Sequence, residues 1–524
     1  MKRVFTRSRL LFALFLLSAF SAFAFYALRS FWVFYTPMIS FLGGGMGLFI
    51  IICAVAALSL GLFVTAYCRV KKNGKPLYKT KLFKVLAIVC AAFSVLSFVG
   101  VIVVVKISGS ETSVAFRLFL KRLFPAMAVL LFAVVALVIL PRQQGRRRTV
   151  LAECLALCVL VTGVCCVFPS ASVKITSDPL VLDTGSDYAV VFGTSAPGTG
   201  FVEYSYGGTD YTVYDQAYGR RAGDRQIHSV HVPYKHLKNN TYTVGSTRVI
   251  EEYAYGSRLG KTVRSKAYTL TVQEGDTQVW LTLSDWHTHT DRALKAASYL
   301  GDYNAVILLG DPAPGMDFEE EALTYLVEFG GEVTHGEMPA VYVRGNHETR
   351  GAYADELPDV LGLEKLYYTV ETGPYTFVVL DSGEDKPDDH IEYGGMDDYS
   401  VSRAEELTWL QTLNVNTDRV IALTHAWQVS EPEPEVSAAA WDEFARLGVK
   451  FVVSGHTHRC RFLDGATEEE QAMLSAHPDI TAYIDGGNRD GVFIASKLTL
   501  SPTGVRFEAA DQNGNKIVEE ERIW

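Results

Sequence analysis

The stretch VWLTLSDWH, residues 279–287, shows the pattern that decides the fold of this chain. A short apolar run, 279–283, leads directly into a polar cluster that contains Asp285 and His287. Short runs of Val, Ile and Leu that end in Gly, Asn, Asp or Ser are typical of buried strands. Carboxylates and imidazoles are common metal ligands. We therefore predict a strand that carries metal ligands at its carboxyl end.

Four more apolar runs end in the same way. They are AVILLGD (305–311), AVYVRGNHE (340–348), VIALTH (420–425) and FVVSGHTH (451–458). In α/β sheets ligands gather at the carboxyl ends of the strands, so a single layout would bring all five polar clusters together. A sixth run, 376–380, ends in Asp381, Ser382 and Gly383. We interpret this sixth run as scaffold.

The donor atoms of these clusters favour a hard or borderline divalent metal rather than a thiolate site. The candidate ligands are Asp285, His287, Asp311, Asn346, His425, His456 and His458. This set is too large for one tetrahedral ion but suits two ions that share a carboxylate. Mn²⁺, Fe²⁺ and Zn²⁺ all fit such ligands. Two ions roughly 3.5 to 4 Å apart can clamp a phosphoryl oxygen and lower the pKa of a shared water, which produces hydroxide near neutral pH.

We predict a catalytic role of another kind for His347. An imidazolium beside the metals can stabilise charge on the phosphoryl oxygens and protonate the leaving alkoxide. Each motif alone is weak, because a lone Asp-x-His or a loop histidine is more often structural. All five in this order are a strong signal that the clusters form one site.

The charge of the chain changes sign at Pro169. Up to that residue there are 20 Lys or Arg and 2 Asp or Glu, and beyond it there are 28 and 56, so the net charges are +18 and −28. The apolar stretches of the first part are long enough to cross a bilayer, which takes about 20 residues. They are residues 10–28, 38–67, 82–105, 123–140 and 150–168. We predict a transmembrane region of about five helices over residues 1–170.

Basic groups precede the first, third and fifth of these stretches, so they share one side of the membrane. The positive-inside rule then places the amino terminus in the cytoplasm and the part after Pro169 outside the cell. The sequence thus predicts a multi-pass protein of the cell membrane. The first stretch can also be read as a signal peptide. The spans are interpreted as an anchor, with a lipid-binding or interaction role as the alternative.

The rest of the chain reads as two domains. Residues 171–275 alternate apolar and polar residues between Gly and Asn turns, which predicts a small β-sandwich of the fibronectin type III or immunoglobulin type. We interpret it as a spacer or docking module. Residues 276–524 alternate apolar runs with amphipathic stretches, which predicts an α/β domain. The expected helices are 317–329, 402–412 and 435–447, and the tail 491–523 is expected to form a closing hairpin.

The five clusters resemble the signature set of the calcineurin-like metallophosphoesterases. The matching motifs are Asp285-x-His287, Gly310-Asp311, Gly345-Asn346-His347-Glu348, Thr424-His425 and Gly455-His456-x-His458. The resemblance covers residues 277–524 and implies two stacked mixed sheets flanked by helices, with a dinuclear centre at one edge. It implies that one metal binds Asp285, His287, Asp311 and His458, and the other Asp311, Asn346, His425 and His456. His347 matches the catalytic histidine of the family.

A β-sandwich before such a domain also resembles the layout of purple acid phosphatases. That group has Asp-x-Gly in the first motif and a metal-bound Tyr three residues after the Asp of the second. In this chain His287 and Pro314 occupy those two positions. The tyrosinate that holds ferric iron is therefore missing, and so is the Asp that the wider family commonly has at the position of Pro314.

The sequence therefore predicts a membrane-anchored, dinuclear-metal phosphoesterase that hydrolyses a phosphomonoester or phosphodiester by attack of metal-bound hydroxide. The expected partner is a phosphate ester, and a membrane location favours lipid-linked or envelope phosphates. The acidic charge after Pro169 argues against nucleic acid. No protein partner is indicated. The alternative is a membrane sensor or scaffold that uses the metal domain for binding without catalysis.

Overall fold

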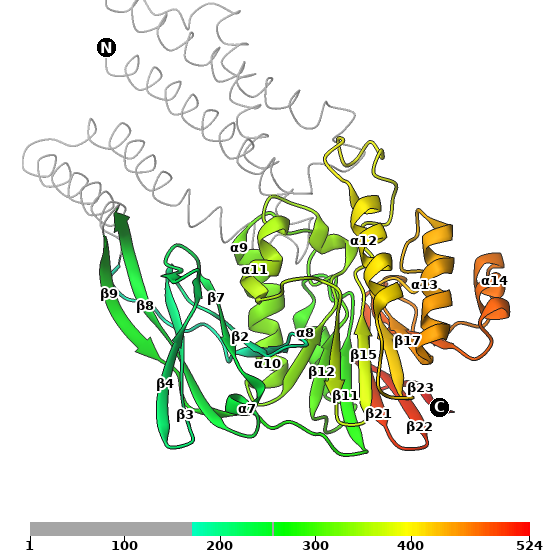
Figure 1. The fold of residues 1–524 in the computed structure, drawn as a ribbon, viewed down its shortest axis with the longest axis horizontal. Helices are drawn as coiled ribbons and strands as arrows, with labels where there is room; N and C mark the ends of the chain where they lie inside the picture. The colour runs from blue at the N-terminus through cyan, green and yellow to red at the C-terminus, as the bar shows by residue number, and fades with distance from the viewer. Residues whose placement is uncertain (1–169, 254–255) are drawn as a thin grey trace, which may run out of the picture. The chain divides into compact units, whose positions relative to one another are not determined.

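The computed structural model describes residues 170–253 and 256–524 of the chain (Figure 1). Its largest element is a ten-stranded mixed sheet. The strand order is β23 (Lys516–Ile523), β22 (Gly504–Asp511), β21 (Val492–Leu500), β11 (Gln278–Leu283), β12 (Ala305–Leu308), β13 (Pro339–Tyr342), β1 (Leu180–Asp183), β2 (Tyr188–Gly193) and β7 (Ile227–Val232), with β20 (Gly487–Arg489) beside β21. The strands β11, β12 and β13 pair in parallel, so their carboxyl ends lie at one edge.

A second mixed sheet of six strands faces the first. Its order is β14 (Tyr368–Thr372), β15 (Tyr375–Val379), β16 (Val420–Leu423), β17 (Val449–Ser454), β19 (Thr481–Ile484) and β18 (Arg461–Phe462). Strands β15, β16, β17 and β19 are parallel to their neighbours in that series. The rings of Trp280 on β11 and Phe377 on β15 lie 4.8 Å apart, and those of Tyr483 and Phe507 lie 4.9 Å apart. These aromatic contacts form part of the core between the sheets.

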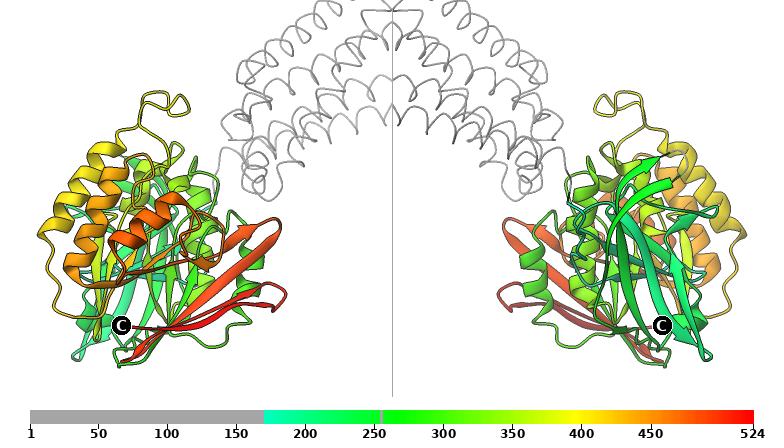
Figure 2. Two further views of the ribbon diagram at one scale, coloured as in Figure 1. Left: turned by 90° about the vertical axis from the view of Figure 1, so that its right-hand side faces the viewer. Right: turned by 90° about the vertical axis from the view of Figure 1, so that its left-hand side faces the viewer.

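Helices α12 (Tyr399–Thr412) and α13 (Pro434–Leu447) cover the outer face of the six-stranded sheet (Figures 1 and 2). Helix α13 buries Ala440, Trp441, Phe444 and Leu447 at spacings of three and four residues, as an amphipathic helix must. It ends at Gly448, whose φ of +74° suits glycine. The spacing in the sequence thus accounts for both the helix and its buried face.

The other helical segments are short. They are α7 (Tyr234–Leu237), α8 (Thr290–Ala297), α9 (Glu319–Glu321), the π-helical η5 (Ala322–Glu328), α10 (Phe329–Thr334), the 3₁₀ turns η6 (Asn346–Thr349) and η7 (Ala354–Glu356), α11 (Leu357–Leu361) and α14 (Glu468–Ala476). The turn η6 begins four residues after the end of β13, so it places the Asn346 and His347 pair at the edge where the parallel strands end.

The sandwich predicted for residues 171–275 needs a correction. A five-stranded sheet does form there from β10 (Tyr268–Thr269), β8 (Thr241–Tyr253), β3 (Gly198–Tyr206), β4 (Thr209–Tyr214) and β9 (Gly256–Arg264), beside a small hairpin of β5 (Gln216–Ala217) and β6 (Arg220–Arg221). It packs against β1, β2 and β7 through a cluster that includes Val190, Val202 and Val244. However, β1 also pairs in parallel with β13, so the facing sheet continues into the next domain. A free-standing fibronectin-like module is therefore not supported.

The predicted α-helical transmembrane region, and the multi-pass membrane location that depended on it, are also corrected. Among residues 170–253 and 256–524, no helix has the length and apolar character of a membrane span. The two long helices α12 and α13 have 14 residues each, or about 21 Å at 1.5 Å per residue, whereas a bilayer core is about 30 Å thick. The stretches read as spans fall within residues 1–169, outside the described residues.

Candidate metal centre

The five polar clusters of the sequence meet at one edge of the two sheets. Asp285 and Asp311 follow β11 and β12, and His425 follows β16. All three side chains are buried, with at most 1% of the residue surface exposed. The Nε2 atom of His425 lies 3.3 Å from Asp311 Oδ2 and 3.9 Å from Asp285 Oδ1. The first sheet therefore supplies the carboxylates, and the second supplies an imidazole that reaches both.

One group of candidate ligands forms around Asp285. Its Oδ1 atom lies 3.2 Å from His458 Nε2, and His458 Nε2 lies 3.4 Å from His287 Nε2. One donor atom from each of these three residues lies within 4.8 Å of the others, close enough to hold a single ion. Asp311 Oδ2 lies 3.7 Å from His287 Nε2, at the border of this group.

A second group forms around Asp311 with His425 and His456, again with donor atoms within 4.8 Å of one another. Asn346 Oδ1 lies 3.1 Å from His456 Nδ1, so its amide oxygen faces the same group. The two groups lie side by side, because Asp311 lies 3.7 Å from His287 and His425 lies 3.9 Å from Asp285. All seven predicted ligands are thus brought together in the structure.

His347 lies at the border between the groups. Its Nε2 atom is 3.7 Å from Asp311 Oδ2, and its ring centre is 4.8 Å from that of His287. Its Nδ1 atom lies 2.9 Å from the carbonyl oxygen of Pro314, which accepts the Nδ1 hydrogen. Pro314 has no carboxylate to orient this histidine, but its backbone carbonyl provides an acceptor. The imidazole is therefore held with Nε2 toward the cluster.

The backbone of the cluster is strained. Asp285, His287, Asp311, His456 and His458 have φ angles of +52°, +37°, +59°, +68° and +54°. Positive φ is unfavourable for residues with a side chain and is found mainly where the surrounding structure imposes it, often at functional sites. Five of the seven predicted ligands have this conformation. The fold thus holds these side chains in place although their backbone conformations are locally unfavourable.

Two buried atoms of the cluster have no hydrogen bond. Asp285 Oδ1 and His425 Nε2 are both inaccessible to solvent, and neither has a partner in hydrogen-bonding geometry. The 3.2 Å contact from His458 Nε2 to Asp285 Oδ1 does not meet that geometry. Unpaired buried polar atoms destabilise a protein, so their presence here needs an explanation. A divalent cation between these donors would satisfy both atoms, and the residues present fit such an ion.

The electrostatics of the cluster favour cations. Burial opposes ionisation of Asp285, but the close contact with His458 and the charges of His425 and His458 outweigh it and lower its pKa to about 2. Burial also opposes a charge on His425 and His458, yet the nearby carboxylates raise their pKa values to about 10 and about 9. A metal ion would replace these protons, because metal binding requires the deprotonated imidazole.

A second layer of contacts orients the ligands. The Nδ1 atom of His425 donates to the carbonyl of Leu309, and Nδ1 of His458 donates to that of Asn488. Partners of this kind fix the tautomer and ring orientation of metal-binding histidines. The Glu431 carboxylate lies 3.1 Å from His456 Nε2 and holds that ring in the same manner. Nothing in the local sequence marked Glu431, because it lies among the acids of residues 431–435, away from the five strand-end clusters.

Glu348 holds the bridging carboxylate in place. It is fully buried and accepts the backbone N–H groups of Asp311 (3.0 Å) and Gly345 (3.2 Å), and the Tyr342 hydroxyl (3.0 Å). The backbone N–H of His347 in turn donates to Asp311 Oδ1 at 3.0 Å. The loop after β12 and the loop after β13 are therefore joined by a network in which the donors are backbone groups and one tyrosine.

Arg350 and Glu384 also lie at the cluster and were not predicted from the sequence. Arg350 Nη1 is 3.2 Å from His347 Nε2, and Arg350 pairs with the buried Glu384. Glu384 follows the sixth apolar run, which was interpreted as scaffold. Its position after β15, the neighbour of β16 in the sheet, is the signal that could have identified it. Asp381, from the same run, forms a two-bond ion pair with Arg344.

Residues 281–460 match the family model of the calcineurin-like phosphoesterases. This segment contains all seven predicted ligands and His347. It is a calcineurin-like phosphoesterase domain. The chain is therefore a metal-dependent phosphoesterase. This agrees with the resemblance of its five motifs to the calcineurin-like metallophosphoesterases. No curated protein has a sequence that matches this chain significantly.

Several solved structures are similar to the chain at low sequence identity. Purple acid phosphatase PPD1 from yellow lupin (Lupinus luteus) seeds is 15% identical, with a TM-score of 0.43, and the match covers 66% of this chain and 73% of that one. A metallophosphoesterase from Sphaerobacter thermophilus is 15% identical, with a TM-score of 0.23 and coverages of 47% and 89%. At these TM-scores the function of the phosphoesterase domain has to be argued from its own residues.

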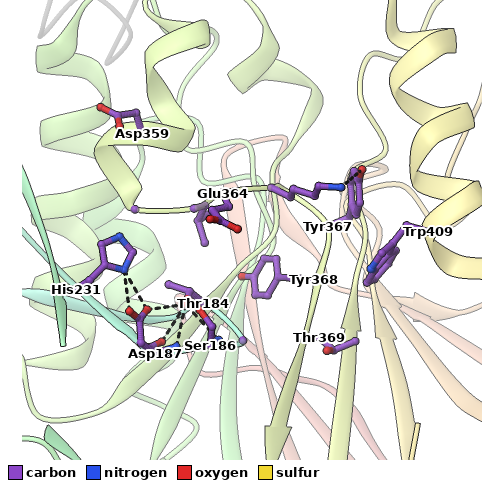
Figure 3. A pocket seen from close by; sticks show the side chains of 14 residues that line it. Thr184, Ser186, Asp187, His231, Asp359, Glu364, Tyr367, Tyr368, Thr369 and Trp409 are labelled. Carbon is purple, nitrogen blue, oxygen red and sulfur yellow. Dashed lines mark hydrogen bonds and ion pairs between the residues drawn. The ribbon is translucent and has the colours of Figure 1, made fainter. Parts of the chain in front are cut away.

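A separate cavity of about 670 Å³ is lined by none of the predicted ligands (Figure 3). One wall carries the Asp187 and His231 ion pair, with 3.0 Å between Oδ1 and Nδ1. The opposite wall carries Tyr367 and Trp409, whose ring centres are 5.1 Å apart. The walls come from the ends of β1, β7 and β14 and from α12. Strands β1 and β7 belong to the ten-stranded sheet and β14 to the six-stranded sheet, and none of the three carries a predicted ligand.

Proposed function

We propose that residues 276–524 hydrolyse phosphate esters at a two-metal centre whose shared ligand is Asp311. The observation that carries the proposal is the pair of donor groups, around Asp285 and around Asp311, that leave two buried atoms without partners. When bound, two divalent cations would withdraw charge from the phosphoryl group and lower the pKa of a water molecule. The metal remains one of Mn²⁺, Fe²⁺ or Zn²⁺, because these ligands suit all three.

The residues of the chain have separate tasks in this proposal. Asp285, His287 and His458 would hold one cation, and Asn346, His425 and His456 the other, with Asp311 between them. His347 would contact the phosphoryl oxygens through Nε2, since its Nδ1 atom is taken by the Pro314 carbonyl. A group in that place can stabilise charge and supply a proton to the leaving alkoxide.

The proposed substrate is a phosphate ester other than a nucleic acid, because the chain after Pro169 carries a net charge of −28. The narrower expectation of a lipid-linked or envelope phosphate depended on a membrane location, and it is not part of the proposal.

Hydrolysis of p-nitrophenyl phosphate and bis-p-nitrophenyl phosphate by the full chain tests the proposal. We expect chelator to abolish turnover, and one of Mn²⁺, Fe²⁺ or Zn²⁺ to restore it. Asp311→Asn should lower kcat by about 100-fold or more, because one change weakens both metal sites, and the metal content of the purified protein should fall with it. Asp302→Asn, at an exposed loop position, is the matched control. If no metal supports turnover of either ester, the protein is a non-catalytic binding module instead.

A further inference from the structure

We propose that Arg350 binds the substrate phosphoryl group and makes the enzyme selective for phosphomonoesters over phosphodiesters. The inference rests on the proposed hydrolysis and concerns the substrate class of the same centre. Arg350 follows η6, three residues after His347, and belongs to none of the motifs that identified the centre.

Arg350 is fixed by a buried carboxylate. Its Nε atom lies 2.6 Å from Glu384 Oε1, and its Nη2 atom lies 2.8 Å from Glu384 Oε2. Only 1% of the surface of Glu384 is exposed, and the hydroxyls of Thr349 (2.9 Å) and Tyr393 (3.0 Å) also donate to this carboxylate. A planar guanidinium held by two parallel hydrogen bonds has little rotational freedom. The direction of its third nitrogen is therefore set by the protein.

That third nitrogen, Nη1, faces the metal centre. It lies 3.2 Å from Nε2 and 3.3 Å from Nδ1 of His347. Among the described residues, no carboxylate accepts a hydrogen bond from Nη1, whereas Nε and Nη2 donate to Glu384 and Asp385. The Arg350 side chain is 23% exposed, so a ligand can reach it. One edge of the guanidinium is thus held by Glu384. The other edge presents N–H donors and a positive charge beside His347.

The charge and the donors match a monoester better than a diester. A phosphomonoester has three oxygens without an ester substituent and carries close to two negative charges at neutral pH. A phosphodiester has two such oxygens and one charge. With two oxygens directed to the metal side, only the monoester keeps a third charged oxygen for the His347 and Arg350 side. A charge-assisted, oriented arginine contact is strong and specific for such an oxygen.

Phosphate binding and ester selectivity test the role of Arg350. In the Mn²⁺-loaded full chain, we expect Arg350→Gln to weaken binding of inorganic phosphate by about tenfold or more, measured by calorimetry. It should lower kcat/KM for p-nitrophenyl phosphate by about 10- to 100-fold and change that for bis-p-nitrophenyl phosphate by less than about threefold. Arg350→Lys should recover part of the loss, because it keeps the charge but not the paired hydrogen bonds.

The matched control is Arg264→Gln. Arg264 uses the same two nitrogens, Nε and Nη2, to pair with Glu203, but it lies on β9 of the five-stranded sheet. Its loss should leave phosphate binding and both esters unchanged. Because Arg350→Gln leaves Glu384 buried without its partner, the double variant Arg350→Gln, Glu384→Gln provides a second measurement in a protein without that unpaired charge.

Equal losses on both esters in the single and double variants, or an unchanged affinity for phosphate, would overturn the assignment of Arg350. The binding measurement does not depend on turnover. If the wild type binds phosphate through Arg350 but cleaves neither ester, the proposed hydrolysis fails while the phosphate site stands.

Discussion

Asp485 is a buried acid near the metal centre whose ionisation should contribute to the pH dependence of stability. Its Oδ1 atom accepts hydrogen bonds from the Ser496 hydroxyl (2.6 Å) and the Gly486 amide (2.9 Å), whereas its Oδ2 atom and the buried Thr282 hydroxyl have no partner. Burial raises its pKa from 3.8 to about 8. The folded protein therefore binds a proton that the unfolded chain releases above about pH 4. This contribution to stability is complete below about pH 4 and is lost as the pH rises to about 8.

We predict that Asp485→Asn makes the stability of the metal-free protein less dependent on pH. The amide cannot ionise, and its N–H₂ group can occupy the place of the Oδ2 proton. The melting temperature of the wild type should include a decline between about pH 4 and pH 8 that the variant lacks. Thermal unfolding followed by circular dichroism across that range gives the answer. Asp302→Asn should follow the wild-type curve, and a variant with the wild-type slope would contradict the assignment to Asp485.

At the scale of elements, the turn after β12 determines where Asp311 lies. Gly310 has a φ of +87°, and a Cβ atom there would lie 2.4 Å from Gly345 N and 3.0 Å from His425 Nδ1. The loops after β12, β13 and β16 therefore meet within the space of one methyl group. Gly301, in the loop before β12, has a similar φ of +73° but no atom within 4 Å of such a Cβ.

This pair of glycines separates backbone strain from crowding. Gly301→Ala should lower the free energy of unfolding by roughly 1 kcal/mol, the effect of a side chain at positive φ alone. Gly310→Ala should lower it by about 3 kcal/mol or more, because the methyl group also pushes the three loops apart. Urea unfolding of both variants measures the difference, and metal binding should weaken only in Gly310→Ala. Equal destabilisation of the two variants would show that the three loops can move apart without lowering the free energy of unfolding.

At the scale of the whole molecule, the pairing of β1 with β13 joins the amino-terminal strands to the phosphoesterase domain. Val181 and Leu182 align with Pro339 and Ala340 in a parallel register. The described residues also form one compact unit from Ser170 to Trp524. We therefore expect the strands before residue 275 and the domain after it to unfold together.

The tryptophans of the chain allow a direct test of this coupling. Six of the seven, Trp280, Trp286, Trp409, Trp427, Trp441 and Trp524, lie after residue 275. Val190 on β2 is fully buried, and Val190→Ala should lower the free energy of unfolding by about 2 kcal/mol. If unfolding is cooperative, the midpoint seen by tryptophan fluorescence will fall as far as the midpoint seen by circular dichroism. A fluorescence midpoint that stays at the wild-type value would mean that the two parts unfold separately.

The sequence by itself determined the elements around the centre and the chemistry of their ends. The apolar runs predicted at 279–283, 305–309, 340–343, 420–423 and 451–453 coincide with β11, β12, β13, β16 and β17 within two residues at each end. Strands of this length are set by local apolar runs and by the polar residues that stop them. The sequence also gives the types of the metal ligands, since the Asp and His residues are read directly from it.

Only the tertiary structure decided which distant segments share a sheet and which charges meet. The interval between Val181 and Pro339 holds more than 150 residues, and no local pattern marks their pairing. Residues 171–275 read as a separate sandwich because each strand looks the same whether its neighbour comes from its own segment or from another. Glu384 and Glu431 were not predicted from the sequence because burial and partners depend on packing rather than on neighbours in the chain. A strand pattern depends on neighbouring residues in the chain, so the sequence predicts it. Contacts between distant side chains depend on how the strands pack, so only the tertiary structure shows them.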